Sequence, residues 1–150
     1  MPALEFRPAA LADALTLVAF ESGIAAGRLY GPLLTAEGAA REIADNVFVF
    51  IMEGGALIGT TAYRVRPNGT GYISNVAIAP QHRRRGIARA AMNLVLEARK
   101  NVRRVELVTH PENVAALALY RSFGFVVESR SENAFGDGEP RLVLARVLAD

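Results

Sequence analysis

The sequence contains no cysteine and no tryptophan. The absence of cysteine excludes disulfide scaffolds, thiolate zinc sites, iron–sulfur clusters and catalysis by a cysteine nucleophile. His82 and His110 are the two histidines of the chain, too few for a histidine-rich metal site, so we expect no metal. The apolar runs are far shorter than the roughly 20 residues of a membrane-spanning helix, and the N-terminus lacks a signal-peptide pattern. We therefore expect a cytoplasmic protein without a membrane partner.

The composition indicates a single folded domain over residues 1–150, because 51% of the residues are hydrophobic and 21% are charged. Lys100 is the one lysine among 17 basic residues, and the others are arginines. The densest basic cluster is His82-Arg83-Arg84-Arg85. Charge concentrated in one short segment suits a compact anion better than a long polyanion, so we expect no nucleic-acid partner.

Hydrophobic periodicity predicts a mixed α/β chain. Residues 47–52, which are β-branched and aromatic, indicate a strand buried on both faces, whereas 86–100 form an amphipathic helical pattern. Thr35 is placed to cap a helix. The expected strands are 5–7, 47–52, 57–66, 71–79, 105–109, 125–131 and 142–148, and the expected helices are 10–22, 36–44, 86–100 and 113–122. The order βααβββαβαββ predicts a mixed sheet with helices packed on it.

The junction after residues 71–79 has the properties of an anion site. The strand stops at Pro80, a basic loop follows, and a helix begins at about Gly86. The first turn of a helix leaves its N–H groups unpaired and directs the positive end of the helix dipole at the loop, which suits phosphate. Gly86 lets the backbone approach an anion, and the small Ala88 keeps the next turn open. A solvated basic loop is the alternative interpretation.

A second segment, from Asn113 to Gly124, places polar side chains on one helix face. Asn113, Ala116 and Tyr120 recur at i, i+3 and i+7, with room for a ligand beside the small alanine. The alternative is that Asn113 caps the helix and that Tyr120 is an ordinary tyrosine at the edge of the core.

The two segments together resemble a known family. Arg83-x-x-Gly86-x-Ala88, after a strand and Pro80, is similar to the Gln/Arg-x-x-Gly-x-Gly/Ala motif of the GCN5-related N-acetyltransferases, the GNAT family. The stretch from Asn113 through Tyr120 to Gly124-Phe125 resembles that family's next helix motif. The resemblance implies an α/β fold of the α+β kind, with a mixed, mostly antiparallel central sheet flanked by helices. It also implies a sheet that splays between the strands 71–79 and 105–109.

Acetyl-CoA is the co-substrate that the resemblance implies. Its pyrophosphate would bind the main-chain N–H groups from Arg84 to Ala88, and its pantetheine arm would pair with the main chain near Val76 and Ile78. Asn113 would hydrogen bond the same arm. The expected acetyl-CoA-binding residues are Val76, Ile78, Arg83, Arg84, Arg85, Gly86, Ile87, Ala88 and Asn113.

The expected reaction is direct attack of a neutral primary amine on the thioester in a ternary complex, because no cysteine is present to carry the acetyl group. Tyr120 would protonate the leaving thiolate, and a main-chain N–H near Val76 would stabilise the oxyanion. The candidates for the general base are His110, Glu106 and Glu112, or a water relay. His110 with Pro111 alternatively only shapes the turn into the helix.

The acceptor is left open between a small-molecule amine and a peptide or protein N-terminal amine. Residues 130–144 are similar to the ending of enzymes that acetylate protein N-termini, although Ala134 and Phe135 replace the two tyrosines common there; a plain hairpin turn is the alternative. Arg28 and Tyr30 are the candidate acceptor-binding residues. Competing functions are a non-catalytic acyl-CoA-binding sensor and a small nucleic-acid-binding protein. The oligomeric state is open, with a homodimer as one option.

Overall fold

The computed structural model describes residues 3–24 and 35–148 of the chain. Its elements follow the predicted order, with two short 3₁₀ turns added. The strands are β1 (Leu4–Pro8), β2 (Val47–Glu53), β3 (Ala56–Val65), β4 (Gly71–Ile78), β5 (Arg104–Thr109), β6 (Val126–Ser131) and β7 (Arg141–Val147). The helices are α1 (Ala14–Ile24), α2 (Ala36–Asp45), α3 (Ile87–Ala98) and α4 (Val114–Ser122), and the 3₁₀ turns are η1 (Leu11–Asp13) and η2 (Pro80–His82). None of the helices in these described ranges is long and apolar enough to cross a membrane.

All seven strands form one sheet in the order β1-β2-β3-β4-β5-β7-β6. Neighbouring strands are antiparallel except for β4 and β5, which run parallel. A parallel pair needs a crossover connection, and α3 lies within it. The predicted mixed, mostly antiparallel sheet flanked by helices is therefore confirmed.

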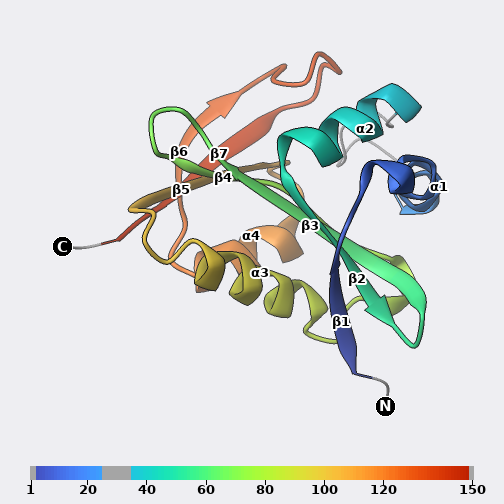
Figure 1. Ribbon diagram of the computed structural model, residues 1–150. Helices are drawn as coiled ribbons and strands as arrows, with labels where there is room; N and C mark the ends of the chain where they lie inside the picture. Colours follow the sequence, from blue (N-terminus) through green and yellow to red (C-terminus); the bar gives the residue numbers. More distant parts are fainter. Residues whose placement is uncertain (1–2, 25–34, 149–150) are drawn as a thin grey trace.

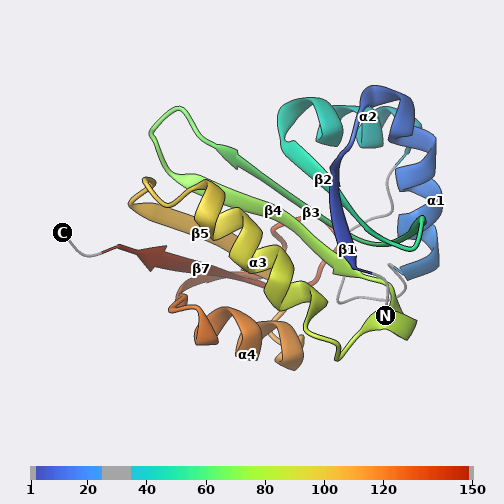
Figure 2. The ribbon, with the colours of Figure 1, turned by 60° about the horizontal axis from the view of Figure 1, so that its bottom comes forward.

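The helices lie on both faces of the sheet. Figures 1 and 2 show α1 and α2 on one face and α3 and α4 on the other. On the first face, Leu17 and Ile43 share a cluster with Phe48 and Phe50 of β2. On the second face, Ile51 of β2 packs in the cluster that includes Ile87 and Ala91 of α3. Strand β2 is thus buried on both faces, as its β-branched and aromatic run predicts.

The largest apolar cluster joins α3 and α4 to the middle of the sheet. Its buried members are Tyr63, Ile73, Met92, Val95, Val105, Leu107, Leu117, Tyr120, Phe125 and Leu144. They come from β3, β4, β5 and β7, from both helices, and from Phe125 directly before β6. This cluster holds the two parts of the sheet together at the end where β4 and β5 pair.

Helix ends differ from the predicted ones for local reasons. The helix predicted over 10–22 divides into η1 and α1 and runs on to Ile24. The Asp13 carboxylate accepts a hydrogen bond from the Ala10 N–H at 2.8 Å, which caps the tight first turn. Thr35 caps α2 as predicted, because its hydroxyl accepts from the Gly38 N–H at 3.0 Å. After α4, Gly124 has a φ of 91°, and the Phe125 N–H donates to the Tyr120 carbonyl, which ends the helix in a Schellman turn.

Candidate active site

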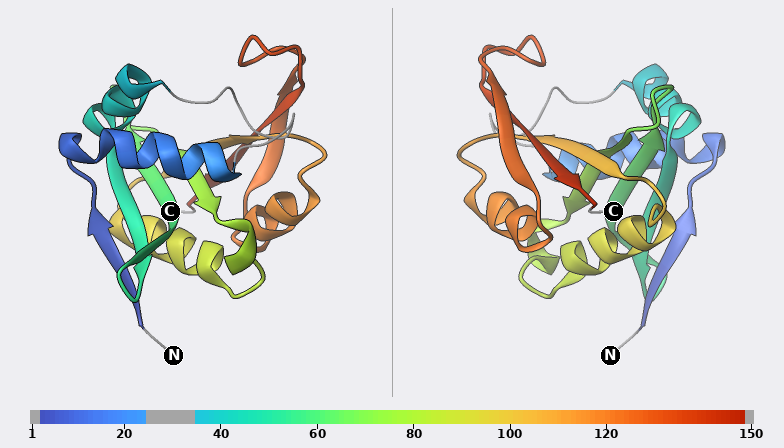
Figure 3. Two further views of the ribbon diagram at one scale, coloured as in Figure 1. Left: turned by 90° about the vertical axis from the view of Figure 1, so that its right-hand side faces the viewer. Right: turned by 90° about the vertical axis from the view of Figure 1, so that its left-hand side faces the viewer.

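Strands β4 and β5 pair at one end and then separate. The pairs are Gly71–Val105, Tyr72–Glu106 and Ile73–Leu107, and no later residue of β4 pairs with β5. From Asn75 to Ile78, β4 pairs only with β3. Figure 3 shows the strands up to β4 on one side and the β6–β7 hairpin on the other, with α3 and α4 beneath them. An edge of β4 in the middle of the sheet therefore carries main-chain groups that no strand uses.

Val76 and Ile78 direct their main-chain groups toward β5. The Ala79 N–H donates to the Ile58 carbonyl of β3 at 2.9 Å, so Ala79 faces β3. Successive residues of a strand alternate in side, so Ile78 and Val76 face the opposite way. In this structure the Ile78 carbonyl accepts a hydrogen bond from Nε of Arg83 at 3.1 Å. An extended ligand could pair with this edge as an added strand does.

The loop between β4 and α3 leads to a helix start with unpaired amides. Arg84 and Gly86 both have positive φ, at 63° and 77°. The N–H groups of the first turn of α3 have no acceptor within the helix and carry the positive end of its dipole. Nothing lies within 4 Å of the Cβ position of Gly86, so its backbone conformation, not crowding, favours glycine there. Ile87 is buried and fixes the helix on the sheet. The surface over Gly86 and Ala88 has the chemistry of a phosphate site.

Arg85 is held by a carboxylate from another hairpin. Its guanidinium forms two hydrogen bonds with Glu53 at the end of β2, one of them at 3.1 Å. Its Nη1 also lies 2.8 Å from Nδ1 of His82. The hydrogen bonds from Arg85 lower the pKa of Glu53 below its usual value. Arg85 and Arg83 therefore both have protein partners beside the predicted phosphate site.

Helix α4 begins at Asn113 and carries Tyr120 two turns later. The Asn113 side-chain oxygen accepts from the Ala116 N–H at 3.4 Å, a long capping bond. The Tyr120 ring packs edge-on against Phe125, with 6.3 Å between ring centroids, and is buried beside Ile73 and Leu107. The capping and core roles are thus observed for both residues. They leave the Asn113 amide NH₂ without a hydrogen-bond acceptor among the described residues.

Burial makes the Tyr120 hydroxyl a weaker acid than an ordinary tyrosine. It raises the pKa of Tyr120 to about 12, so the hydroxyl stays protonated at neutral pH. A thiol has an ordinary pKa of about 8.5, well below that of this phenol. Tyr120 is therefore better suited to donating a hydrogen bond to a leaving thiolate than to giving up its proton completely.

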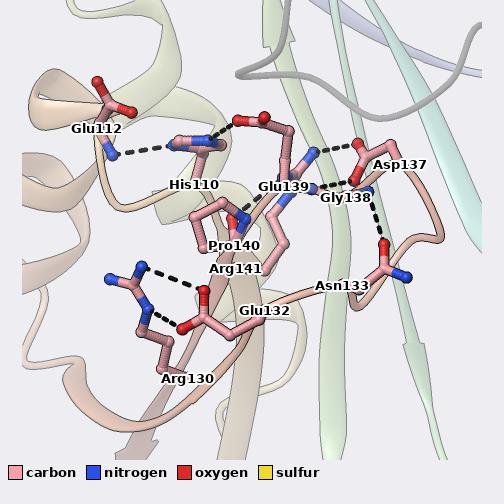
Figure 4. A network of polar contacts seen from close by, with 10 residues as sticks. All are labelled: His110, Glu112, Arg130, Glu132, Asn133, Asp137, Gly138, Glu139, Pro140 and Arg141. Carbon is pink, nitrogen blue, oxygen red and sulfur yellow. Dashed lines mark hydrogen bonds and ion pairs between the residues drawn. The ribbon is translucent and has the colours of Figure 1, made fainter.

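His110, directly after β5, has both ring nitrogens engaged. Its side chain is fully buried, with 0% of its surface exposed. Nδ1 accepts a hydrogen bond from the Glu112 main-chain N–H at 3.0 Å, and Nε2 lies 2.9 Å from Oε1 of Glu139 (Figure 4). An accepting Nδ1 assigns the proton to Nε2, which donates to the carboxylate. In this arrangement neither nitrogen offers a lone pair to an acceptor amine.

The other predicted bases differ in their surroundings. Glu106 lies at the joined end of β4 and β5 and forms ion pairs with Arg66 at 2.7 Å and Arg104 at 2.8 Å. Burial raises the pKa of Glu106, but the hydrogen bonds from Arg104 and Arg66 outweigh it and lower that pKa below its usual value. Glu112 contributes its main-chain N–H to His110 (Figure 4). A carboxylate held by two arginines is a weak base, which disfavours Glu106.

Two predicted residues and one cavity lie outside this arrangement. Arg28 and Tyr30 fall outside the described residues. A cavity of about 300 Å³ lies at the carboxyl end of α3, where Leu96, Arg99 and Phe123 contribute to its lining. The amides at the amino end of α3 are at the opposite end of that helix. The cavity therefore has no part in the site described above.

Glu53 and Glu139 are the two site residues that sequence reasoning missed. Each meets its partner across a long stretch of chain, Glu53 with Arg85 and Glu139 with His110. Glu53 lies in no motif, whereas Glu139 lies within residues 130–144, the segment similar to the ending of enzymes that acetylate protein N-termini. The one local signal is that Glu139 follows Asp137-Gly138, where the Asp137 carboxylate accepts from the Glu139 N–H at 3.0 Å.

Comparisons with known proteins agree with this architecture. The family model described as Acetyltransferase (GNAT) family matches residues 15–125. Among curated protein sequences, none matches the chain.

Solved structures share the fold at low identity. The ribosomal-protein-S18-alanine N-acetyltransferase of Escherichia coli is 19% identical, with a TM-score of 0.83 over 99% of this chain and 96% of that one. Ard1 of Thermoplasma volcanium is 20% identical, with a TM-score of 0.81 over 99% of both chains. A chain of the NatC complex bound to Gag peptide and CoA is 19% identical, with a TM-score of 0.79 over 97% of this chain and 99% of that one.

The match to the family model spans more than half of the chain and includes both segments on which the resemblance was based. The opening between β4 and β5, with the amides of α3 at its edge, is the arrangement that the resemblance implied. The chain belongs to the GNAT family of acetyltransferases.

Proposed function

We propose that this protein is an N-acetyltransferase that transfers the acetyl group of acetyl-CoA to a primary amine by direct attack in a ternary complex. The observation that carries the proposal is the edge of β4 at Val76 and Ile78 with which no described strand pairs and which leads directly to the amides at the start of α3. This edge offers hydrogen bonds to an extended arm, and the helix start suits a pyrophosphate. The GNAT family membership supports acetyl-CoA as the molecule that carries both.

Different residues bind acetyl-CoA, stabilise the oxyanion and donate to the leaving sulfur. Main-chain groups from Arg84 to Ala88 bind phosphate oxygens, and Asn113 donates its amide NH₂ to the arm. The Val76 N–H, directed toward the opening, stabilises the oxyanion that forms on the thioester carbonyl. Tyr120, protonated because of its raised pKa, donates to the sulfur as the carbon–sulfur bond breaks.

The acceptor is a primary amine, and we propose a peptide or protein N-terminal amine as the first class to test. Two of the structural relatives are named as ribosomal-protein alanine N-acetyltransferases, and a third is a chain of a complex bound to a Gag peptide and CoA. A small-molecule amine is the second class, since other structural relatives include a phosphinothricin N-acetyltransferase by its putative assignment. Arg28 and Tyr30 remain candidate acceptor-binding residues.

Two measurements test the proposal. Calorimetry with acetyl-CoA should show saturable binding that Gly86→Asp abolishes, because a side-chain carboxylate at the helix start repels phosphate. Release of free thiol should then require an amine, and Tyr120→Phe should lower kcat by about 10²-fold, the lower end of general-acid effects. Absence of acetyl-CoA binding would contradict the proposal.

A non-catalytic acyl-CoA sensor is the competing function. It would bind acetyl-CoA with the same dependence on Gly86 but release no thiol with any amine. The buried, protonated Tyr120 favours the enzyme, since a sensor has no need of a proton donor near the sulfur.

A further inference from the structure

We propose that the Glu139 carboxylate, oriented by His110, binds the acceptor ammonium and removes its protons. The inference rests on the proposed N-acetyltransferase function and supplies the base that neither strand β4 nor Glu106 provides. Its starting point is the contact of 2.9 Å between Nε2 of His110 and Oε1 of Glu139 (Figure 4). His110 is a positioning residue in this scheme, whereas Glu139 is the residue that touches substrate.

The register of the sheet puts this pair beyond the joint of β4 and β5. Thr109 pairs with Leu142 of β7, so His110 and Glu139 both lie just past that pair. Strand β5 pairs with β4 only as far as Leu107. The two side chains therefore lie on the rim of the opening where the acetyl donor is proposed to bind.

The pair also lies on the side from which an acceptor can approach. The tip of the β6–β7 hairpin, which carries Glu139, projects away from α3 and α4 (Figures 1 and 3). The amides proposed to bind the phosphates are at the start of α3. Donor and acceptor would thus reach the opening from opposite faces of the sheet, so both can be bound at once for direct attack.

The hydrogen bonds fix the direction of the carboxylate. The Glu112 N–H donates to Nδ1 of His110 at 3.0 Å, so Nε2 is the nitrogen that donates to Glu139. The main chain of Glu139 is fixed in turn by Asp137, whose carboxylate accepts from its N–H and also pairs with Arg141 at 3.0 Å.

The Glu139 side chain is partly exposed, so a substrate can reach it. The Glu139 side chain keeps 28% of its surface exposed, whereas His110 behind it has none. Charged groups of the described chain near it include Glu112 beside the His110 ring and Asp137 with Arg141 on its own hairpin. The exposed part of the Glu139 side chain is the part that an incoming ammonium can reach.

Two protons leave the nitrogen and one reaches the sulfur in the proposed reaction. Glu139 takes a proton from the bound ammonium and passes it to solvent, and the neutral amine attacks the thioester carbonyl carbon. As the carbon–nitrogen bond forms and the carbon–sulfur bond breaks, the nitrogen loses a second proton through Glu139. The thiolate, which accepts a hydrogen bond from Tyr120, gains one proton from solvent. The net products are the amide, the free thiol and one proton.

The test compares Glu139→Gln with Glu132→Gln in the full chain. Glutamine keeps an oxygen that accepts from His110 but is not a base. Glu132 lies on the same hairpin, 74% exposed and paired with Arg130, so it is a matched control. The acceptor probes are an alanine-led tetrapeptide amide, spermidine and tyramine, followed by thiol release.

With the probe that the wild type uses best, Glu139→Gln should lower kcat/KM by at least about 10²-fold, the range of general bases. In this variant the rate should follow the free amine alone and rise tenfold per pH unit below the pKa of the amine, whereas the wild type should also react with the protonated amine. Acetyl-CoA binding and the Glu132→Gln variant should match the wild type. Wild-type activity and a wild-type pH profile in Glu139→Gln would overturn the inference and leave the N-acetyltransferase proposal standing.

A second measurement does not depend on turnover. In a ¹³C NMR titration of the acetyl-CoA-bound protein, propylammonium should shift the Glu139 carboxylate signal saturably, whereas propanol should not. No shift with propylammonium would overturn the inference even if all three probes fail to react. Failure to bind acetyl-CoA at all would instead contradict the proposed function.

Discussion

Gly59 of β3 lies opposite Ile78 of β4, and a Cβ atom added to Gly59 would lie 2.8 Å from Cδ1 of Ile78 and 3.0 Å from the Ala77 carbonyl oxygen. Any side chain at position 59 would therefore displace the strand that carries the proposed ligand edge. We expect Gly59→Ala to lower the free energy of unfolding by about 1–3 kcal/mol through overpacking and to weaken acetyl-CoA binding. Urea unfolding and calorimetry measure the two effects.

The control for that substitution is Gly23→Ala in α1, where nothing lies within 4 Å of the Cβ position. This change should stabilise the protein by about 0.5–1 kcal/mol, the usual gain of alanine over glycine in a helix. Normal binding and stability in Gly59→Ala would show that β4 adjusts freely.

Gly86→Ala tests the conformation of the phosphate loop. With a φ of 77°, an alanine there costs about 1–2 kcal/mol of backbone strain, which the loop relieves by leaving the binding geometry. We expect acetyl-CoA to bind about tenfold more weakly, the equivalent of 1.4 kcal/mol. Gly69→Ala is matched in strain, since Gly69 has a φ of 86° and equally open surroundings, but it lies in the β3–β4 turn. It should lose stability and keep its affinity; equal affinities in the two variants would argue against the loop as the phosphate site.

Glu53→Gln should release Arg85. The substitution removes one negative charge beside the proposed phosphate site, so acetyl-CoA should bind up to about fivefold more tightly at low salt, in line with exposed ion pairs. The gain should vanish at high ionic strength because exposed charges are screened. Glu128→Gln, which frees Arg104 from a similar two-bond pair, should leave the affinity unchanged. Weaker binding in Glu53→Gln would mean that the pair positions Arg85 for the ligand instead of diverting it.

His110→Gln separates positioning from catalysis. Loss of the ring leaves Glu139 less well directed, and misplacement of a catalytic group costs up to about 10²-fold, so kcat/KM should fall by about 10- to 100-fold. The shape of the pH profile should stay that of the wild type, because Glu139 is still present. A rate that follows the free amine alone in His110→Gln, with a wild-type profile in Glu139→Gln, would assign the base to His110.

The raised pKa of Tyr120 predicts that the free energy of unfolding decreases at alkaline pH. The pKa of Tyr120 is about 12 in the folded chain, above the ordinary value of about 10, so the unfolded chain loses this proton first. The stability that Tyr120 contributes is complete below pH 10 and is lost as the pH rises toward 12, by up to about 3 kcal/mol. In urea unfolding between pH 9 and 11.5, Tyr120→Phe should therefore lose less stability than the wild type. Burial also raises the pKa of Tyr72, which is present in both proteins and cancels in the comparison. Parallel pH dependences in the two proteins would show that Tyr120 is solvated.

The elements of the fold were predictable because their signals are local. Thr35 caps a helix through a residue three positions away, and Gly124 ends another through a bond that closes within six residues. The β-branched and aromatic run that marks β2 as a buried strand likewise lies in consecutive residues. The opening between β4 and β5 was expected from the family resemblance alone, since periodicity predicts strands but not where a pair of them separates.

The charge pairs of the site were beyond sequence reasoning. Arg83 to Arg85 form an evident basic cluster, but whether their charge faces a ligand depends on Glu53, 32 residues before Arg85. His110 was proposed as a base from its chemistry, yet the availability of its nitrogens depends on Glu139, 29 residues later in another hairpin. Both contacts depend on sheet register and loop conformation. Local sequence patterns predict neither of these two properties.

The sheet has two parts, β1 to β4 and β5 to β6, which are joined by three residue pairs between β4 and β5. Ile73, Leu107 and Leu144 fill the core at that junction, so their volumes set the angle between the two parts. Because each part moves as a unit, a small change of this angle, caused by one methyl group, becomes a larger displacement at the open end. The width offered to donor and acceptor can therefore be tuned by buried apolar residues that touch neither molecule.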